Sequence, residues 1–244
     1  VGAGLLTISH VINFQLCRAC RFCEHEDSME HSQVIFRASD VSLGYGERTI
    51  LHGINLEVHQ GEFWFFLGQN GGGKTTLMKA VLGLIAPQSG NLWLHPVSAS
   101  REQIGFVPQR CELNPTLPTT VKEFVLLGLV GISVDRRERE IRLTWALEKM
   151  GLSGQEERNY WSLSGGQRQR VGVARALFGE PPVLLMDEPF GALDPITRAE
   201  LRREFARIQR VVGTTVMMVT HDLGEAFELA TRVGVVDDGR LVLC

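Results

Sequence analysis

Short and almost wholly hydrophobic runs recur along the chain and predict buried strands. The run at 62–67, EFWFFL, is followed by a glycine, and similar runs occupy 183–187 and 215–220. Runs of this kind are typical of central strands that are covered on both faces. Less continuous patterns, rich in β-branched residues, predict two more strands at 34–43 and 54–58.

Two stretches have hydrophobic residues at the spacing of one helical face. The first follows Lys74, with hydrophobic residues at Leu77, Ala80, Val81 and Leu84, and the segment APQSG at 86–90 is expected to end it. The second has its hydrophobic residues at Leu143, Ala146, Leu147 and Met150, and Gly151 is expected to cap it. The charged run at 135–140 then predicts a solvated face at the start of this second helix.

The order of these elements predicts the fold class. We expect a turn at 44–47, a further helix at 199–211, and a closing hairpin at 233–243 around the pair Asp238-Gly239. Strand patterns disappear after residue 110, and residues 110–175 are expected to form a largely helical insert. Strands alternating with helices on both sides of such an insert indicate an α/β fold with parallel strands.

Composition narrows the functional classes. The chain has 244 residues, of which 44% are hydrophobic, so it suits one large domain with a sizeable core. A formal net charge of −3 argues against nucleic acid as the main partner. No run of 18 hydrophobic residues occurs, so the sequence predicts no membrane-spanning helix.

Three of the five cysteines are clustered near the start of the chain. Cys17, Cys20 and Cys23 have a spacing that zinc or iron–sulfur sites use, with His25 or His31 as a fourth ligand. A ferredoxin-type run would continue with a fourth cysteine and a proline, which this sequence lacks. We therefore interpret residues 1–33 as a disordered N-terminal extension, with the domain itself at 34–244.

The segment GQNGGGKTT carries the clearest chemistry. Its residues are Gly68, Gln69, Asn70, Gly71, Gly72, Gly73, Lys74, Thr75 and Thr76. The match to G-x-x-x-x-G-K-[ST] lies between a predicted strand and a predicted helix, which is the context that a phosphate-binding loop requires. Backbone N–H groups would surround phosphate oxygens, Lys74 would meet the β- and γ-phosphates, and Thr75 would bind Mg²⁺.

Polar residues directly follow two of the buried strands. Asp187 is placed to hold Mg²⁺, and Glu188 to accept a proton from an attacking water. His221 follows the strand at 215–220, where it is a candidate contact to the γ-phosphate. A second cluster of small residues, at 164–166, is also placed to open a helix.

The motifs together resemble the nucleotide-binding subunit of an ABC transporter, over roughly residues 34–243. Tyr45 matches the adenine-stacking aromatic of that family, and Gln109 the loop glutamine that joins core to helical insert and reaches Mg²⁺. Ser164, Gly165, Gly166 and Gln167 lie in the signature LSGGQ, Asp194 in the aspartate loop, and His221 is the switch histidine.

The resemblance implies a P-loop NTPase core with a RecA-like parallel sheet, an antiparallel β subdomain and the helical insert at 110–175. It implies ATP and Mg²⁺ as ligands, and a head-to-tail homodimer in which Ser164–Gly166 of one copy faces the ATP that Lys74 of the other copy holds. The chain would then lie at the cytoplasmic face of a cell membrane, bound to permease subunits and served by an extracytoplasmic substrate-binding protein.

The cargo is less constrained than the chemistry. Residues 104–129 resemble zinc and manganese importer ATPases, whereas residues 186–201 resemble importers of organic solutes such as glycine betaine, sulfonates or nitrate. We expect a metal ion, because the loop after Gln109 would lie nearest the permease. The alternatives are an organic-solute importer and a non-transport module in which ATP switches a partner.

Overall fold

The computed structural model divides the chain into two compact units. The first unit combines the chain up to Trp93 with His221–Cys244, and the second is Leu94–Thr220. The residues described are 33–96, 103–109, 116, 118–191, 193–222, 224, 226 and 229–243. The predicted N-terminal extension and its cysteines lie outside this part, and the domain boundaries at 33 and at 110–175 stay predictions.

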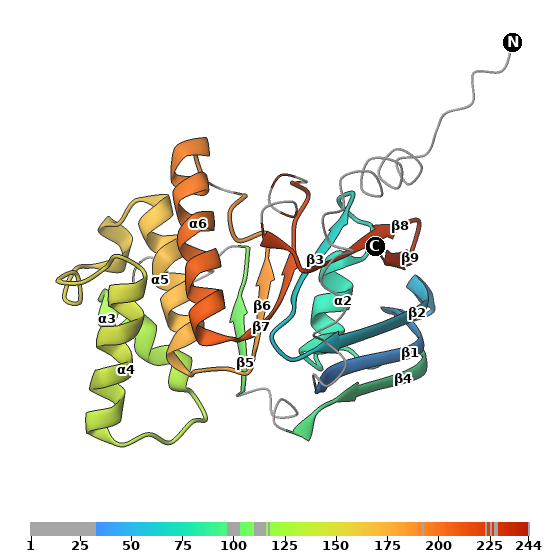
Figure 1. The fold of residues 1–244 in the computed structure, drawn as a ribbon, viewed down its shortest axis with the longest axis horizontal. Helices are drawn as coiled ribbons and strands as arrows, with labels where there is room; N and C mark the ends of the chain where they lie inside the picture. Colours follow the sequence, from blue (N-terminus) through green and yellow to red (C-terminus); the bar gives the residue numbers. More distant parts are fainter. Residues whose placement is uncertain are drawn as a thin grey trace, which may run out of the picture. The chain divides into compact units, whose positions relative to one another are not determined.

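The first unit contains two groups of strands and the helix α2 (Figure 1). The antiparallel group has the order β2-β1-β4, and in the other group β3 pairs parallel with β8, which pairs antiparallel with β9. The bounds are β1 Val34–Tyr45, β2 Arg48–His59, β3 Phe63–Gly68, α2 Lys74–Val81, β4 Ser89–Leu94, β8 Arg232–Asp237 and β9 Arg240–Leu243.

The second unit places helices around three parallel strands in the order β5-β6-β7. Helix α5 packs against α3 and α4 on one side of these strands, as Figure 1 shows. The bounds are β5 Ile104–Val107, α3 Val121–Leu126, η5 Leu127–Leu129, α4 Arg136–Lys149, η6 Tyr160–Ser162, α5 Gly165–Phe178, β6 Val183–Asp187, α6 Pro195–Val212 and β7 Thr215–Val219.

Burial confirms the strands that the hydrophobic runs predict. Every residue of β7 is buried, and the same holds for β3 up to Leu67 and for β6 up to Met186. The predicted stripe of α4 is also buried, and Gly151 follows the helix with a φ of 62°, the left-handed conformation that ends helices. The three buried strands and the buried stripe of α4 were thus both predictable from the local sequence pattern.

The structure corrects several boundaries. Helix α2 ends at Val81, because Gly83 has a φ of 64° and turns the chain out of the helix, so Leu84 is exposed instead of buried. Strand β2 begins at Arg48, since its pairing with β1 continues to the turn. Helix α6 begins at Pro195, four residues before the predicted start, and strands β4 and β5 were not predicted.

Candidate functional site

The glycine loop joins β3 to α2 within the first unit. Gly73 is the N-cap of α2, with a left-handed φ of 107° and no side chain capping the helix. The first turn of α2 carries no acidic residue. Backbone N–H groups at such a helix start carry partial positive charge and lack intrahelical partners, so the local structure suits a bound anion.

The loop needs glycine at individual positions for different reasons. A Cβ at Gly68 would lie 2.3 Å from the carbonyl oxygen of Val236, and one at Gly73 would lie 2.6 Å from Cδ2 of Leu51. Gly71 has a φ of 84°, yet a Cβ there would meet nothing within 4 Å. The two ends of the loop, at Gly68 and Gly73, are therefore tightly packed. The space beside Gly71 is open and leaves room for a ligand.

Lys74 connects the loop to the start of α2. Its side chain is buried with 5% exposure, and Nζ donates hydrogen bonds to the carbonyl oxygens of Gly68 at 2.7 Å and Gln69 at 2.9 Å. A buried ammonium group needs hydrogen-bond acceptors, and these two backbone carbonyls provide them beside the loop. A phosphate is a stronger acceptor than these carbonyls, so this arrangement fits ATP.

Tyr45 lies at the end of β1, in the same unit as the loop. Its ring is 46% exposed, and Nζ of Lys79 lies 5.5 Å from the ring centroid. Lys79 belongs to α2, whose first residue is Lys74. The helix that begins at the glycine loop therefore contacts the ring that is predicted to stack on adenine.

The end of β6 brings two of the predicted residues together in the second unit. Nε2 of Gln109, which follows β5, donates a hydrogen bond of 2.7 Å to Oε2 of Glu188. Glu188 has a φ of 44°, a left-handed conformation that is rare outside glycine, and its N–H donates to the carbonyl oxygen of Val219 at 2.9 Å. Such backbone strain is concentrated at functional sites.

Two more of the predicted residues follow buried strands in the chain, Asp187 in the second unit and His221 at the start of the last segment of the first unit. Asp187 is the last residue of β6 and is half-buried. His221 is exposed, and Asp222 accepts a hydrogen bond from the N–H of Gly224 at 2.8 Å. No group of three or more His, Cys, Asp or Glu residues that would hold a metal ion occurs among the described residues.

The second small-residue cluster opens α5, as predicted. Oγ of Ser164 accepts from the N–H of Gln167 at 3.2 Å, and the Gln167 side chain accepts from the N–H of Ser164 at 3.0 Å. This reciprocal pair is a capping box. Because the serine oxygen acts as the acceptor in it, the hydroxyl hydrogen can still be donated outward.

The starts of α5 and α6 lie beside each other. A Cβ at Gly166 would approach Cγ2 of Thr197 to 2.7 Å, whereas one at Gly165 would meet nothing within 4 Å. Thr197 is in the first turn of α6, where its N–H donates to Oδ1 of Asp194 at 3.0 Å. Gly166 is thus required by packing, and packing within this chain does not require Gly165.

This difference gives a prediction for stability. We expect Gly166→Ala to destabilise the protein by about 1–3 kcal/mol, because Thr197 must move to admit the methyl group. Gly165→Ala should leave stability unchanged or raise it, since alanine is the better helix residue. Urea unfolding of the two variants beside the wild type tests this, and equal losses in both would contradict it.

Asp194 caps α6 and has a perturbed titration. Hydrogen bonds from the side chain and backbone N–H of Thr197 lower the pKa of its carboxyl below the ordinary value. A carboxyl whose pKa is lowered on folding stabilises the fold above its unfolded-state pKa of about 4. That contribution is lost as the pH falls through the folded-state pKa.

The consequence is a pH-dependent mutational effect. Asp194→Ala should lower the melting temperature at pH 7, and the difference from wild type should shrink as the pH falls below about 4. Glu123→Gln is measured beside it, because Glu123 is a second carboxyl whose pKa is lowered, in this case by hydrogen bonds with Thr120 in the capping box of α3. A difference for Asp194→Ala that stays constant from pH 7 to pH 3 would exclude the titration of Asp194 as its cause.

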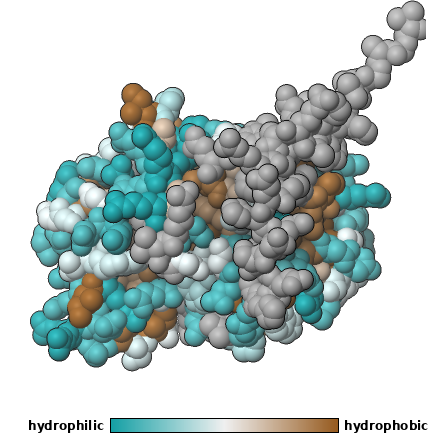
Figure 2. Space-filling model, viewed as in Figure 1, coloured by the Kyte–Doolittle hydropathy of each residue, from teal (hydrophilic) through white to brown (hydrophobic). Residues whose placement is uncertain are grey.

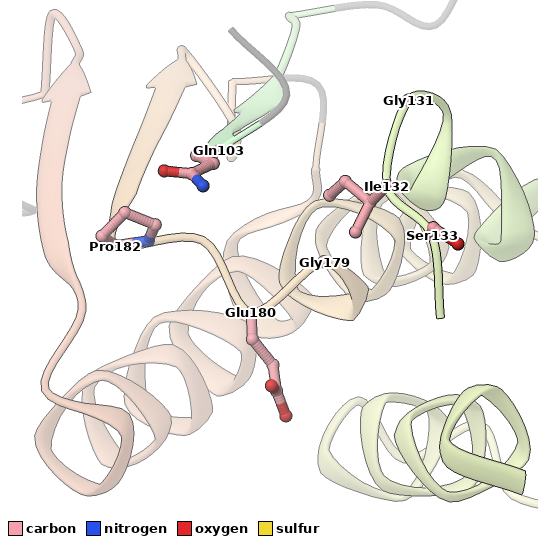
Figure 3. Close-up of a pocket in the computed structure, with 7 residues that line it drawn as sticks. All are labelled: Gln103, Gly131, Ile132, Ser133, Gly179, Glu180 and Pro182. Atoms are coloured by element: carbon pink, nitrogen blue, oxygen red, sulfur yellow. The ribbon is translucent and has the colours of Figure 1, made fainter. Parts of the chain in front are cut away.

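A hollow of about 500 Å³ lies in the second unit, away from Glu188. It is lined by Gln103 and Pro182, which precede β5 and β6, and by residues 131–133 and 179–180 (Figure 3). Because β5 and β6 are parallel, their first residues lie at one edge and Gln109 and Asp187 at the other. The hollow is therefore not where the predicted phosphate chemistry takes place.

The face of the molecule that Figure 2 shows is mainly polar where it is coloured. In the view of Figure 2 the hydrophobic patches are small and separate, and most of the coloured surface is hydrophilic. Among the described residues, no helix combines the length and the hydrophobicity needed to cross a membrane.

A glycine loop of this geometry, followed by a helix that begins at Lys74, defines a P-loop nucleotide-binding protein. Comparison with protein families makes the class more specific: the family described as ABC transporter matches residues 51–191. The chain belongs to this family, whose ATP-binding subunits are ATPases.

Known relatives support the same assignment. The chain is 40% identical over 205 residues to the glycine betaine/carnitine/choline transport ATP-binding protein OpuCA of Bacillus subtilis, covering 81% of this chain and 53% of that protein. It is 37% identical over 220 residues to the aliphatic sulfonates import ATP-binding protein SsuB 1 of Agrobacterium fabrum, covering 90% and 77%. The chain thus spans about half the length of the first of these relatives.

Solved structures agree with the fold. The structure of cbiO1 from Clostridium perfringens, part of the ABC transporter complex cbiONQ, superposes with a TM-score of 0.77. It is 30% identical in sequence, and the match covers 87% of this chain and 88% of that one. The predicted P-loop NTPase fold is confirmed by this likeness.

Proposed function

We propose that this chain is the ATP-hydrolysing subunit of an ABC importer for an organic solute. The observation that carries the proposal is the glycine loop with its buried Lys74, in a chain whose relatives are named for transport or import.

The first unit binds the nucleotide. The N–H groups from Gly71 to Thr76 surround the phosphates, and Lys74 exchanges its carbonyl acceptors for phosphate oxygens. Tyr45 stacks on the base. Phosphate contacts give most of the affinity, because charge-assisted hydrogen bonds are about twice as strong as neutral ones.

Residues at the strand ends carry out the hydrolysis. Glu188 accepts the proton of the attacking water, and its backbone strain and its bond from Gln109 fix the direction of the carboxylate. His221 contacts the γ-phosphate. Thr75, Asp187 and the amide oxygen of Gln109 would hold Mg²⁺, whose charge would offset that of the phosphates.

Two copies complete the site. We assign the start of α5, residues 164–167, to the ATP of a partner copy, and Asp194 to the same interface. Gly165 supports this assignment, because no described residue lies within 4 Å of where its Cβ would be, so packing against them does not explain the missing side chain. The hydroxyl hydrogen of Ser164 and the start of α5, whose first turn carries no acidic residue, would donate to the γ-phosphate.

The cargo is an organic solute instead of the metal ion that the middle of the sequence suggested. The prediction of metal transport is not supported, since the relatives are named for glycine betaine, carnitine, choline and aliphatic sulfonates. The similarity that suggested a metal was confined to residues 104–129, whereas the relatives match across most of the chain. The second candidate is a non-transport module in which ATP switches a partner and turnover is incidental, and the predicted base Glu188 favours transport over it.

The partners follow from this function. The proposed importer contains permease subunits, which the helical insert at 110–175 and Gln109 contact at the cytoplasmic face of the membrane. An extracytoplasmic substrate-binding protein delivers the solute.

An uptake assay tests the proposal. The chain would be reconstituted in liposomes with candidate permease subunits, and uptake of labelled glycine betaine, an aliphatic sulfonate and zinc would be compared. ATP-dependent uptake of an organic solute supports the proposal. Uptake of zinc alone, or ATP hydrolysis with no uptake of any kind, would contradict it. Lys74→Ala is the control for energy coupling.

A further inference from the structure

Tyr45 occupies an exposed hairpin tip that needs support from outside the hairpin. The paired residues Tyr45 and Arg48 enclose a turn of two residues, and Gly46 has a φ of 56°. Exposed tips of this kind open easily, because few buried contacts oppose their fraying. A ring that must meet a nucleotide base in a fixed direction therefore requires a local restraint.

Gln88 supplies such a restraint. Its amide Nε2 donates to the carbonyl oxygen of Gly46 at 2.8 Å, and its Oε1 accepts from Oγ1 of Thr49 at 2.8 Å. Its backbone N–H also donates to the carbonyl oxygen of Ser42 at 2.8 Å. The side chain thus joins the turn that follows Tyr45 to β2, using its donor and its acceptor at once, while the backbone N–H ties the same residue to β1.

A second contact fixes the ring toward the phosphate loop. Lys79 of α2 places its ammonium group 5.5 Å from the centroid of the Tyr45 ring, which is a cation–π distance. Gln88 restrains the backbone on one side of the ring, and Lys79 holds the ring beside the helix that Lys74 begins. Together the contacts of Gln88 and Lys79 fix the distance between the Tyr45 ring and the glycine loop that is proposed to bind the phosphates.

We propose that Gln88 is a positioning residue for the nucleotide base. It holds the β1–β2 turn so that Tyr45 presents its ring for stacking, while the phosphates are bound elsewhere. The inference rests on the proposed function, in which Tyr45 stacks on the base of ATP. It predicts an effect on ligands that carry a base and none on ligands that consist of phosphate alone.

The test compares ATP with inorganic tripolyphosphate by calorimetry. Gln88→Leu keeps the approximate size and removes both hydrogen bonds, so it should weaken ATP binding about three- to tenfold. Tripolyphosphate affinity and kcat at saturating ATP should stay unchanged. Thr49→Val removes the hydroxyl that donates to Oε1 of Gln88, and with it one of the two side-chain bonds of Gln88. It should weaken ATP binding by less than Gln88→Leu does. Gln60→Leu, an exposed glutamine elsewhere in the unit, is the matched control.

A double-mutant comparison separates positioning from general damage. Tyr45→Ala should weaken ATP binding about tenfold by removing the stacking partner. In that background Gln88→Leu should have no further effect. Equal weakening of ATP and tripolyphosphate, or an undiminished effect of Gln88→Leu in Tyr45→Ala, would overturn the proposal. If Lys74→Ala bound both ligands like the wild type, the proposed function would fail instead.

Discussion

Glu188→Gln is expected to bind ATP with unchanged affinity and to hydrolyse it about 10²- to 10⁴-fold more slowly. The amide has nearly the shape of the carboxylate, but it cannot accept the proton of the attacking water. Gln109 donates to Oε2 of Glu188, and the amide oxygen of the variant can still accept that bond, so the local structure should persist. Phosphate release in a single turnover measures the chemical step directly.

Glu180→Gln is the matched control for this variant. Glu180 is an exposed glutamate of the same unit, it also has a left-handed φ of 48°, and it forms an ion pair of 3.0 Å with Arg142. Its replacement removes an exposed ion pair, which contributes little to stability, and should leave hydrolysis unchanged. If Glu188→Gln kept the wild-type rate, another group would have to act as the base.

Lys74→Ala is expected to lose ATP affinity by about 10- to 100-fold, because hydrogen bonds to charged groups are the strong ones. The lysine is buried against the loop carbonyls of Gly68 and Gln69, so its ammonium group is already ordered before the phosphate arrives. Calorimetric titration with ATP and with tripolyphosphate should show the same loss for both ligands.

The control for Lys74 is a lysine of the other unit. Lys122 lies in α3, and Lys122→Ala removes one positive charge without touching the loop. Its ATP affinity should equal that of the wild type. Equal losses of ATP affinity in the two variants would indicate that binding depends only on the net charge of the protein. Unchanged ATP binding by Lys74→Ala would indicate that the loop does not bind the nucleotide.

The sequence predicts those features that local pattern determines. The hydrophobic runs of β3, β6 and β7 are each short and continuous, which is typical of strands covered on both faces. The glycine loop is recognisable because strand, glycines, lysine and helix follow directly in the chain. The capping box of Ser164 and Gln167 is likewise visible as a serine three residues before a glutamine.

Other features depend on contacts that no local pattern carries. Gln109 and Glu188 are 79 residues apart, and their hydrogen bond exists only because β5 and β6 are parallel neighbours. The left-handed backbone conformation of Glu188 cannot be predicted from the presence of a glutamate at that position. Strand β5 is missed because four residues are too few for a periodic pattern. The start of α6 had a usable signal, since an aspartate before proline is typical of a helix N-terminus.

The central claim is that ATP joins two copies of this chain through Lys74 of one and the start of α5 of the other. The most direct test is the mass of Glu188→Gln in solution, with and without Mg-ATP, beside the same variant carrying Ser164→Arg. We predict a dimer that requires ATP and that Ser164→Arg abolishes while each copy still binds ATP. A variant that binds ATP and stays monomeric, or a dimer that Ser164→Arg leaves intact, would contradict the claim.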